Sequence, residues 1–107
     1  MLYKFKSKAA GDVIMLQPNG KQVLQIMGND AEPKGIILPA QMAGAIAALN
    51  AAIAQEEADR KAAIELALKE GRSAPGFDAI TLRQRAHPFI EMLRKCEAAG
   101  KEIVWGV

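Results

Sequence analysis

His87 and Cys96 are the only residues of their types in the chain, and they form the only pair that could join a base to a nucleophilic thiol. A cysteine attacks as its thiolate, which near neutral pH needs a base within hydrogen-bond reach. The two residues are separated by about 13 Å along a helix at roughly 1.5 Å per residue, and they fall on different sides of it. The spacing therefore predicts no catalytic pair. Cys96 is expected to be a small buried hydrophobe, and His87 an exposed residue that interacts with Glu91 one turn later.

Metal and phosphate chemistry are also disfavoured by residue type and spacing. A single histidine and a single cysteine are too few for a multi-histidine or multi-cysteine metal site. A phosphate cradle needs glycines at fixed offsets before a helix, so that backbone N–H groups can reach the oxygens. Neither glycine pattern occurs, and Gly20 with Lys21 is interpreted as part of a first helix. We expect no catalytic residue, no metal and no cofactor.

Basic side chains form two groups in the sequence. Residues 82–101 hold five basic and two acidic residues, a local charge of +3, against +2 for the whole chain. At helical spacing Arg83, His87 and Arg94 share one strip, and Arg85 and Lys95 lie on the other polar flank. A second group lies on the predicted N-terminal hairpin. The candidate interaction residues are Arg83, Arg85, His87, Arg94, Lys95, Lys4 and Lys6.

The two basic groups would form one electropositive surface if the outer face of the first strand lay beside this last helix. Such a surface could meet a phosphate backbone, another anionic ligand or an acidic protein. Aromatic residues that would stack on bases make up only 5% of the chain, and most of them are needed in the core. An ordinary solvated polar face is therefore the favoured interpretation.

The elements that position these residues are expected to form one domain spanning residues 1–107, a length sufficient for a hydrophobic core. Alternation over residues 2–6 predicts a half-buried strand. The apolar run at residues 13–16 predicts a second strand, covered on both faces or central in the sheet. A short helix follows from Pro18 to Met27, and a brief extended segment is expected at residues 36–38. Residues 103–105 should return to the sheet, with Trp105 mostly buried.

Residues 39–70 predict one long helix, because strong helix formers dominate them. Its apolar stripe is Met42, Ile46, Leu49, Ile53, Ile64 and Leu68. At roughly 48 Å the helix exceeds the diameter of about 34 Å expected for a domain of this size. It must overhang, or break near Gln55 to Asp59. A set of small residues permits close approach of another helix, either the last helix or the same helix of a second copy: Ala43, Gly44, Ala47, Ala51 and Ala54.

Thr81 and Gln84 have the spacing of a capping box and predict the start of the last helix. Its buried face is predicted to be Leu82, Ala86, Phe89, Leu93 and Cys96. Pro88 lies inside it and cannot donate to the carbonyl of Gln84, so a kink or a restart at His87 is expected. A turn at residues 73–76 separates the two long helices.

Three stretches of the sequence are specific in content and order: MLYKFKSKAAGDV at residues 1–13, KGII and PAQM within residues 34–42, and GKEIVWGV at residues 100–107. In these stretches the chain resembles a family of small bacterial proteins catalogued as domain of unknown function 1840. The resemblance spans nearly the whole chain. It implies a small single-domain bacterial protein, and since the family has no assigned activity it carries over no functional residue.

The sequence as a whole predicts an α+β fold, a small and mostly antiparallel sheet of three to four strands packed with three helices, one of them long and Ala-rich. The expected function is that of a small non-catalytic protein-interaction or adaptor module, with a second copy or an unidentified protein as partner. Nucleic-acid or anionic-ligand binding through the basic last helix and N-terminal hairpin is the alternative. No apolar run is long enough to span a bilayer and no signal-peptide pattern opens the chain, so we expect a cytoplasmic protein without membrane association.

Overall fold

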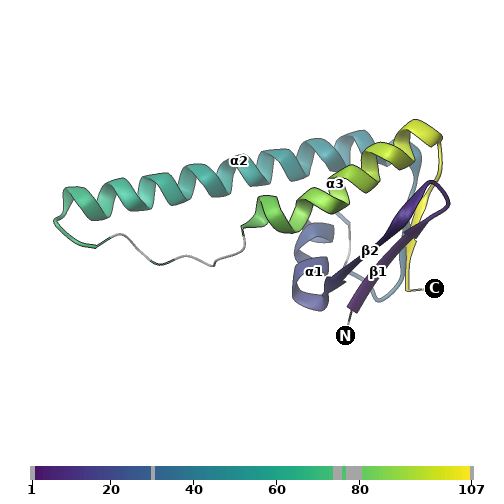
Figure 1. Ribbon diagram of the computed structural model, residues 1–107, viewed down its shortest axis with the longest axis horizontal. Coiled ribbons are helices and arrows are strands. Elements are labelled where there is room, and N and C mark those ends of the chain that lie inside the picture. The colour runs from purple at the N-terminus through teal and green to yellow at the C-terminus, as the bar shows by residue number, and fades with distance from the viewer. Residues whose placement is uncertain (1, 30, 74–75, 77–80, 107) are drawn as a thin grey trace.

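The computed structural model describes residues 2–29, 31–73, 76 and 81–106. The elements follow one another as β1 (Leu2–Ser7), β2 (Ala10–Leu16), α1 (Gln17–Ile26), β3 (Gly35–Ile37), α2 (Pro39–Lys69), α3 (Leu82–Ala99) and β4 (Ile103–Trp105). Figure 1 shows the sheet at one end of the molecule and α2 running along most of its length. The α+β prediction is confirmed. The turn predicted at residues 73–76 lies partly outside the described residues.

The sheet has the strand order β2-β1-β4-β3, and every neighbouring pair is antiparallel. β1 and β2 form the predicted hairpin, and β4 returns between β1 and β3 with Trp105 opposite Phe5. The extended segment before α2 is a true strand, paired to β4 through Ile37 and Ile103. Tyr3 and Phe5 alternate with exposed or half-buried lysines, so β1 is half-buried as the sequence predicts.

β2 contradicts one expectation, because it is an edge strand with one uncovered face. Met15 is 7% exposed, whereas its neighbours Ile14 and Leu16 are 56% and 61% exposed. The continuous apolar run suggested burial on both faces, but the period-2 geometry of a strand sends alternate side chains to opposite sides. The side that holds Ile14 and Leu16 faces away from all three helices.

α1 packs against the sheet through Val23 and Leu24, which are fully buried. Pro18 lies in its first turn, where a missing N–H is tolerated. Gly20 is buried against Tyr3, close enough that a β-carbon there would lie 2.6 Å from the ring. The predicted short helix is confirmed, and its glycine brings α1 close to β1.

α2 is one continuous helix of 31 residues. The break considered near Gln55 to Asp59 does not occur. Alanine, glutamate and lysine favour helix throughout this stretch, and Glu56 with Arg60 and Gln55 with Asp59 pair across single turns. The molecule consequently measures 52 × 28 × 22 Å, with a Cα radius of gyration of 16.0 Å. The C-terminal half of α2 extends beyond α3 and the sheet (Figure 1).

The predicted stripe of α2 is buried only where α3 and the sheet lie beneath it. Met42, Leu49 and Ile53 are buried, and Ile46 is half-buried against the core. Farther along, Ile64 is half-buried and Leu68 is 65% exposed. Of the two expectations for this helix, overhang or break, the overhang is confirmed, and it leaves Leu68 in solvent on the protruding half.

α3 begins with the predicted capping box, in which the Thr81 hydroxyl accepts from the Gln84 amide at 3.2 Å and Gln84 Oε1 accepts from the Thr81 amide at 2.9 Å. The helix is continuous through Pro88, so it does not restart at His87. The five residues predicted for its buried face are all buried, Cys96 completely. Gly100 ends the helix in the left-handed conformation, at φ 66°.

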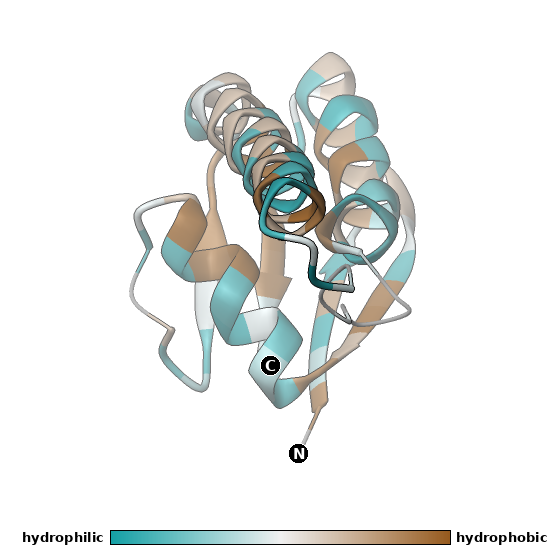
Figure 2. Cartoon of the chain, turned by 90° about the vertical axis from the view of Figure 1, so that its left-hand side faces the viewer, coloured by the Kyte–Doolittle hydropathy of each residue, from teal (hydrophilic) through white to brown (hydrophobic). Residues whose placement is uncertain are grey.

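All three helices lie on one side of the sheet, and the core fills the space between them (Figures 1 and 2). Phe5 is at its centre, with ring centroids 4.5 Å from Phe89 of α3 and 5.8 Å from Trp105 of β4. Trp105 is 3% exposed, as predicted, and its indole Nε1 donates to the Glu32 carbonyl at 3.0 Å. None of the described helices covers the other side of the sheet.

Candidate functional site

Three of the predicted interaction residues meet on the surface where α2 and α3 run side by side. Arg83, His87 and Arg94 line a shallow hollow of about 230 Å³. The remaining residues around it are Asn50, Ile53 and Ile90. The strip predicted from helical spacing is therefore formed. Arg85, half-buried, and Lys95, exposed, project from the other flank of α3.

The two arginines of this strip are paired with carboxylates. Arg83 Nε lies 2.6 Å from Glu57 Oε1 on α2, and Arg94 Nη1 lies 3.0 Å from Glu91 Oε1 on α3. The hydrogen bond from Arg83 lowers the pKa of Glu57 below its ordinary value and raises the pKa of Arg83 itself. Glu91 thus pairs with Arg94, and the expected His87–Glu91 interaction is replaced. The pairing reduces the net positive charge of the strip.

Lys4 and Lys6 do not join this strip, because the sheet and its core lie between them. They alternate along β1 with Phe5, whose ring contacts Phe89 on the inner side of α3. Their side chains therefore point away from the helices, and Lys4 lies 3.7 Å from Asp12 on β2. The single electropositive surface considered from the sequence is not formed. The basic residues divide into two groups on opposite sides of the molecule.

The side chains around Lys4 and Lys6 form what we call the open face of the sheet. Strand register places Leu2 opposite Leu16, Lys4 opposite Ile14, and Lys6 and Ile36 both beside Val104. The open face consists of Leu2, Lys4, Lys6, Asp12, Ile14, Leu16, Ile36 and Val104. Leu2, Ile14, Leu16 and Ile36 are 47–61% exposed, and none of the described helices covers them.

Sequence reasoning identified the lysines of the open face but missed its apolar residues. The signal was present in the alternation of β1, since every residue opposite an outward lysine must also point outward. The apolar run of β2 hid it, because such a run is compatible with burial on both faces. The apolar part of the open face was therefore not predicted.

A second group of exposed residues lies on the protruding half of α2. Leu66 and Leu68 are 52% and 65% exposed there, and the apolar end of the helix is seen in Figure 2. Nearer the globule, an open hollow of about 510 Å³ between α1 and α2 is lined partly by Gln55, Glu56 and Asp59. We call residues 58–69 the α2 end.

The small residues of α2 are exposed and do not face α3. Ala43, Gly44, Ala47, Ala51 and Ala54 are all solvent-accessible. Of the two interpretations left open by the sequence, packing of this helix against the last helix does occur, but through side chains other than these small residues. A seam with a second copy stays a prediction.

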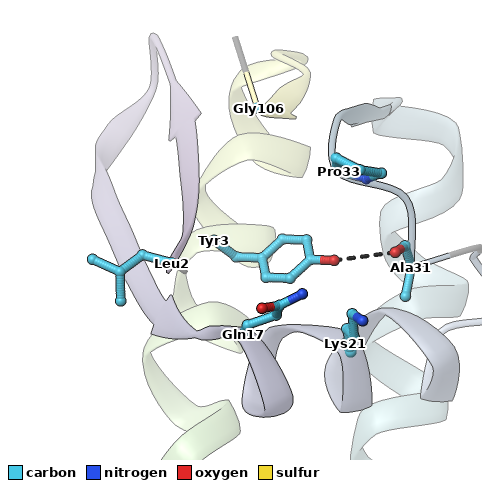
Figure 3. A pocket seen from close by; sticks show the side chains of 7 residues that line it. All are labelled: Leu2, Tyr3, Gln17, Lys21, Ala31, Pro33 and Gly106. Carbon is cyan, nitrogen blue, oxygen red and sulfur yellow. Dashed lines mark hydrogen bonds between the residues drawn. The ribbon is translucent and has the colours of Figure 1, made fainter.

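Figure 3 shows a small cavity between β1, α1 and the segment before β3. The Tyr3 hydroxyl donates to the Ala31 carbonyl at 3.1 Å, and the side chains of Gln17 and Lys21 lie on the α1 side of the ring. The cavity holds about 220 Å³, less than the about 300–1,000 Å³ usual for ligand pockets. A single ammonium and an amide can orient a few waters or a small anion, but they form no acid–base pair.

The described ranges bring no nucleophile and base together. Cys96 is completely buried and His87 is exposed on the same helix, so the thiol and the imidazole do not meet. Within these ranges, no three His, Cys, Asp or Glu side chains are grouped so that they could hold a metal ion. No helix in the same part of the chain combines the length and hydropathy needed to cross a bilayer.

The fold and its two exposed apolar regions define a small α+β protein with an uncovered sheet face. The chain belongs to the family described as Domain of unknown function (DUF1840), whose model matches residues 1–105. The resemblance seen in the sequence is thereby confirmed. No curated protein and no solved structure was found to match the chain.

Proposed function

We propose that this protein is a non-catalytic protein-interaction or adaptor module that acts as a homodimer. The observation that supports the proposal is the placement of its exposed large apolar side chains. In the described part of the chain these side chains form two groups. The first lies at or beside the open face and consists of Leu2, Ile14, Leu16, Ile36 and Leu38. The second lies on the α2 end and consists of Leu66 and Leu68.

Exposure of clustered apolar side chains to water is unfavourable in free energy for an isolated molecule. Burial of apolar surface contributes about 25 cal/mol per Å², and contiguous apolar patches on soluble proteins commonly mark interaction surfaces. The exposed β2 edge adds unpaired backbone groups beside the patch. Association would remove both features from water, which is why a binding role explains them better than an ordinary solvated surface.

The non-catalytic part of the proposal rests on the side chains available for chemistry. The thiol of Cys96 is enclosed by the core, and His87 is on the solvent side of α3. Arg83 and Arg94 are held by carboxylates rather than aimed into a closed cavity. A single buried thiol also suits a reducing compartment, and we propose the cytoplasm of a bacterium as its location.

The alternative function, binding of nucleic acid or another anionic ligand, has less support from the geometry. It required the hairpin lysines and the arginines of α3 to act together, whereas Lys4 and Arg83 lie on opposite sides of the sheet layer. Each group would have to bind alone, with few phosphate contacts. Association between protein surfaces is therefore the function we propose first.

Sedimentation equilibrium over a hundredfold range of protein concentration tests the proposal. We expect the mass to rise from that of one chain, 11.5 kDa, to that of two, because burial of the apolar surfaces is a mass-action equilibrium. A monomeric mass at every concentration would contradict the homodimer.

A further inference from the structure

We propose that the homodimer forms through the β2 edge, the side of β2 that faces away from β1, with β2 of one copy antiparallel to β2 of the other. The inference rests on the proposed homodimer and adds the surface that forms it. The strand order places β2 at one end of the sheet. Among the described strands only β1 pairs with β2, so the β2 edge still presents backbone N–H and C=O groups.

The two edges of this sheet differ in how they are protected against further pairing. Soluble proteins protect an exposed edge with a short strand, proline, lysine or a bulge. β3, at the other edge, has only three residues, and Pro33, Lys34 and Pro39 lie within two residues of its ends. β2 has seven residues and contains no proline, lysine or arginine. β2 is therefore the edge that can accept another strand.

A bulge in β2 limits where a partner strand can lie. Phe5 is opposite Val13 and Ser7 is opposite Ala10, so two steps along β1 correspond to three steps along β2. The extra residue lies between Ala10 and Val13, and a bulge interrupts regular pairing. Residues 13–16 are paired with β1 without interruption. The regular half of β2 is therefore the part that pairs with a second copy.

Side-chain polarity selects the register of this pairing. Directly opposite residues of an antiparallel pair point to the same face, so the twofold axis must pass through one residue of β2. An axis at Ile14 places Ile14 opposite its own copy on the open face and Val13 opposite Met15 on the core side. An axis at Val13 would place Asp12 opposite Ile14. An axis at Met15 would pair only three residues before α1 begins at Gln17.

A second copy fits this edge because β2 is complementary to itself in this register. Apolar side chains meet at the axis, and no residue is opposite a like charge. At the ends of the paired segment Leu16 is opposite Asp12, whose carboxylate is already paired with Lys4 on its own sheet. The exposed Ile14 and Leu16 of both copies then lie close together near the axis. A strand with charges at these positions would not offer this match.

The twofold axis is perpendicular to the sheet, so corresponding faces of the two copies lie on the same side. All three helices lie on one side of each sheet (Figure 2). Both helical layers therefore share one side of the dimer, and both open faces share the other. The two four-stranded sheets become one continuous sheet with identical contacts from each copy.

The contact is short, which predicts a weak dimer. Five paired residues span about 17 Å at roughly 3.4 Å per residue. A strand pairing of this length falls short of the about 1,200 Å² of total area typical of stable interfaces. On the helical side, Arg85 and Lys95 project from the flank of α3 that is turned away from α2 and towards the second copy. Salt screens the repulsion between these basic flanks, so the dimer Kd should fall as the salt concentration rises.

Substitution at the axis tests the contact. Ile14→Lys places two like charges directly opposite each other, and we expect the dimer Kd in sedimentation equilibrium to rise at least about tenfold. Ile36→Lys is the matched control, because it makes the same change at an exposed isoleucine of the open face, but on β3 at the far edge. It should leave the Kd unchanged. Circular dichroism of both variants confirms that the fold is kept.

A residue on the twofold axis meets only its own copy, which permits a complementary test. Ile14→Glu should weaken the dimer as Ile14→Lys does. An equimolar mixture of the two variants pairs opposite charges at the axis, so it should dimerise more tightly than either variant alone.

Cysteine substitution tests the register. Opposite residues of antiparallel strands have Cα atoms about 4.5–5.5 Å apart, within the range of about 4.4–6.8 Å usual for disulfides. Ile14→Cys should therefore form a covalent dimer on mild oxidation. Leu16→Cys is the control, because in this register the two copies of residue 16 are about 14 Å apart at roughly 3.4 Å per residue. Cys96 is completely buried and does not compete.

Three results overturn the inference while the homodimer stands. The first is a dimer that Ile14→Lys does not weaken. The second is equal weakening by Ile14→Lys and Ile36→Lys, which is expected if two open faces pack against each other. The third is a Kd that rises with salt, which indicates a contact held by opposite charges. A wild-type chain that stays monomeric at every concentration contradicts the proposed function itself.

Discussion

Two glycines lie inside helices, and the space around each decides what a methyl group would do. Gly20 of α1 faces the buried ring of Tyr3, and a β-carbon there would lie 2.6–2.9 Å from three Tyr3 atoms. Gly44 of α2 is exposed, with nothing within 4 Å of the same position. The two sites therefore separate the packing effect of a methyl group from its effect on helix propensity.

We expect Gly20→Ala to destabilise the protein by about 1–3 kcal/mol, because Tyr3 or α1 must shift to make room. Gly44→Ala should stabilise it by about 1 kcal/mol through helix propensity alone. Urea unfolding followed by circular dichroism gives both free energies of unfolding. Equal effects of the same sign would show that α1 does not approach β1 as closely as described.

Trp105 is the residue whose loss should cost the core most. Its ring lies beside Phe5, covers Gly35 and donates a hydrogen bond to the Glu32 carbonyl. Trp105→Ala should lower the free energy of unfolding by about 3–5 kcal/mol, since it leaves a large cavity. Trp105→Phe keeps much of the packing and should cost less. Thermal unfolding of both variants checks the order, and an unchanged midpoint for Trp105→Ala would exclude β4 from the folded core.

At the scale of elements, the pair Glu57–Arg83 links α2 to α3. The hydrogen bond to Arg83 holds the pKa of Glu57 below its ordinary value. The stabilisation from this pair is therefore fully present above the pKa of Glu57 in the unfolded chain. It is lost as the pH falls through the lower pKa of the folded state. Both groups are exposed, so the effect on overall stability is small.

NMR titration of the Glu57 carboxyl carbon measures this pairing directly. In Arg83→Gln the pKa of Glu57 should rise towards its ordinary value, because the charged hydrogen bond is removed. Arg94→Gln is the matched control, since Arg94 pairs with Glu91 on its own helix, and it should leave Glu57 unchanged. A Glu57 pKa that is the same in wild type and Arg83→Gln would contradict the interhelical pair.

Elements were predictable where local rules agree with the tertiary structure. The capping box at Thr81 and Gln84 and the helix formers of α2 act through neighbouring residues, so their signals survive in any fold. The buried face of α3 followed from helical periodicity. The exposure of Ile14 was not predictable, because it depends on which elements come to lie next to β2. The exposure of Leu68 was one of two alternatives, since helix length alone predicts an overhang or a break. A sequence shows that a residue is apolar, but not whether anything covers it.

The candidate site shows the same division between local and tertiary information. Arg83, His87 and Arg94 meet because a single helix spaces them, and periodicity alone predicts that. Their relation to Lys4 and Lys6 depends on which face of the sheet α3 covers. Because Phe5 packs against Phe89 of α3, α3 covers the face of β1 that holds Phe5, and both lysines point to the opposite face. The open face exists because α1, α2 and α3 all pack on the other face of the sheet, and this arrangement is tertiary information.

At the scale of the whole molecule, the distribution of charge governs how it can meet a polyanion. The formal charge is only +2, and the two basic groups lie on the open face and on α3, with the core between them. Several basic residues also have carboxylate partners, including Lys4 with Asp12 and Arg94 with Glu91. A nucleic acid lying on one side would therefore contact only one basic group and would also meet its acidic partners.

We expect weak binding to heteropolymer DNA or RNA that disappears near physiological salt. Few neutralised phosphates mean little counterion release, and hence a shallow dependence of log K on log salt concentration. Fluorescence anisotropy of a labelled oligonucleotide between low and physiological salt measures both the affinity and this slope. Lys4→Glu and Arg94→Glu, made separately, should each change the slope by about one contact or less. Tight binding with a steep slope that both variants reduce would mean that the two basic groups act together. That result would favour the nucleic-acid function over the homodimer.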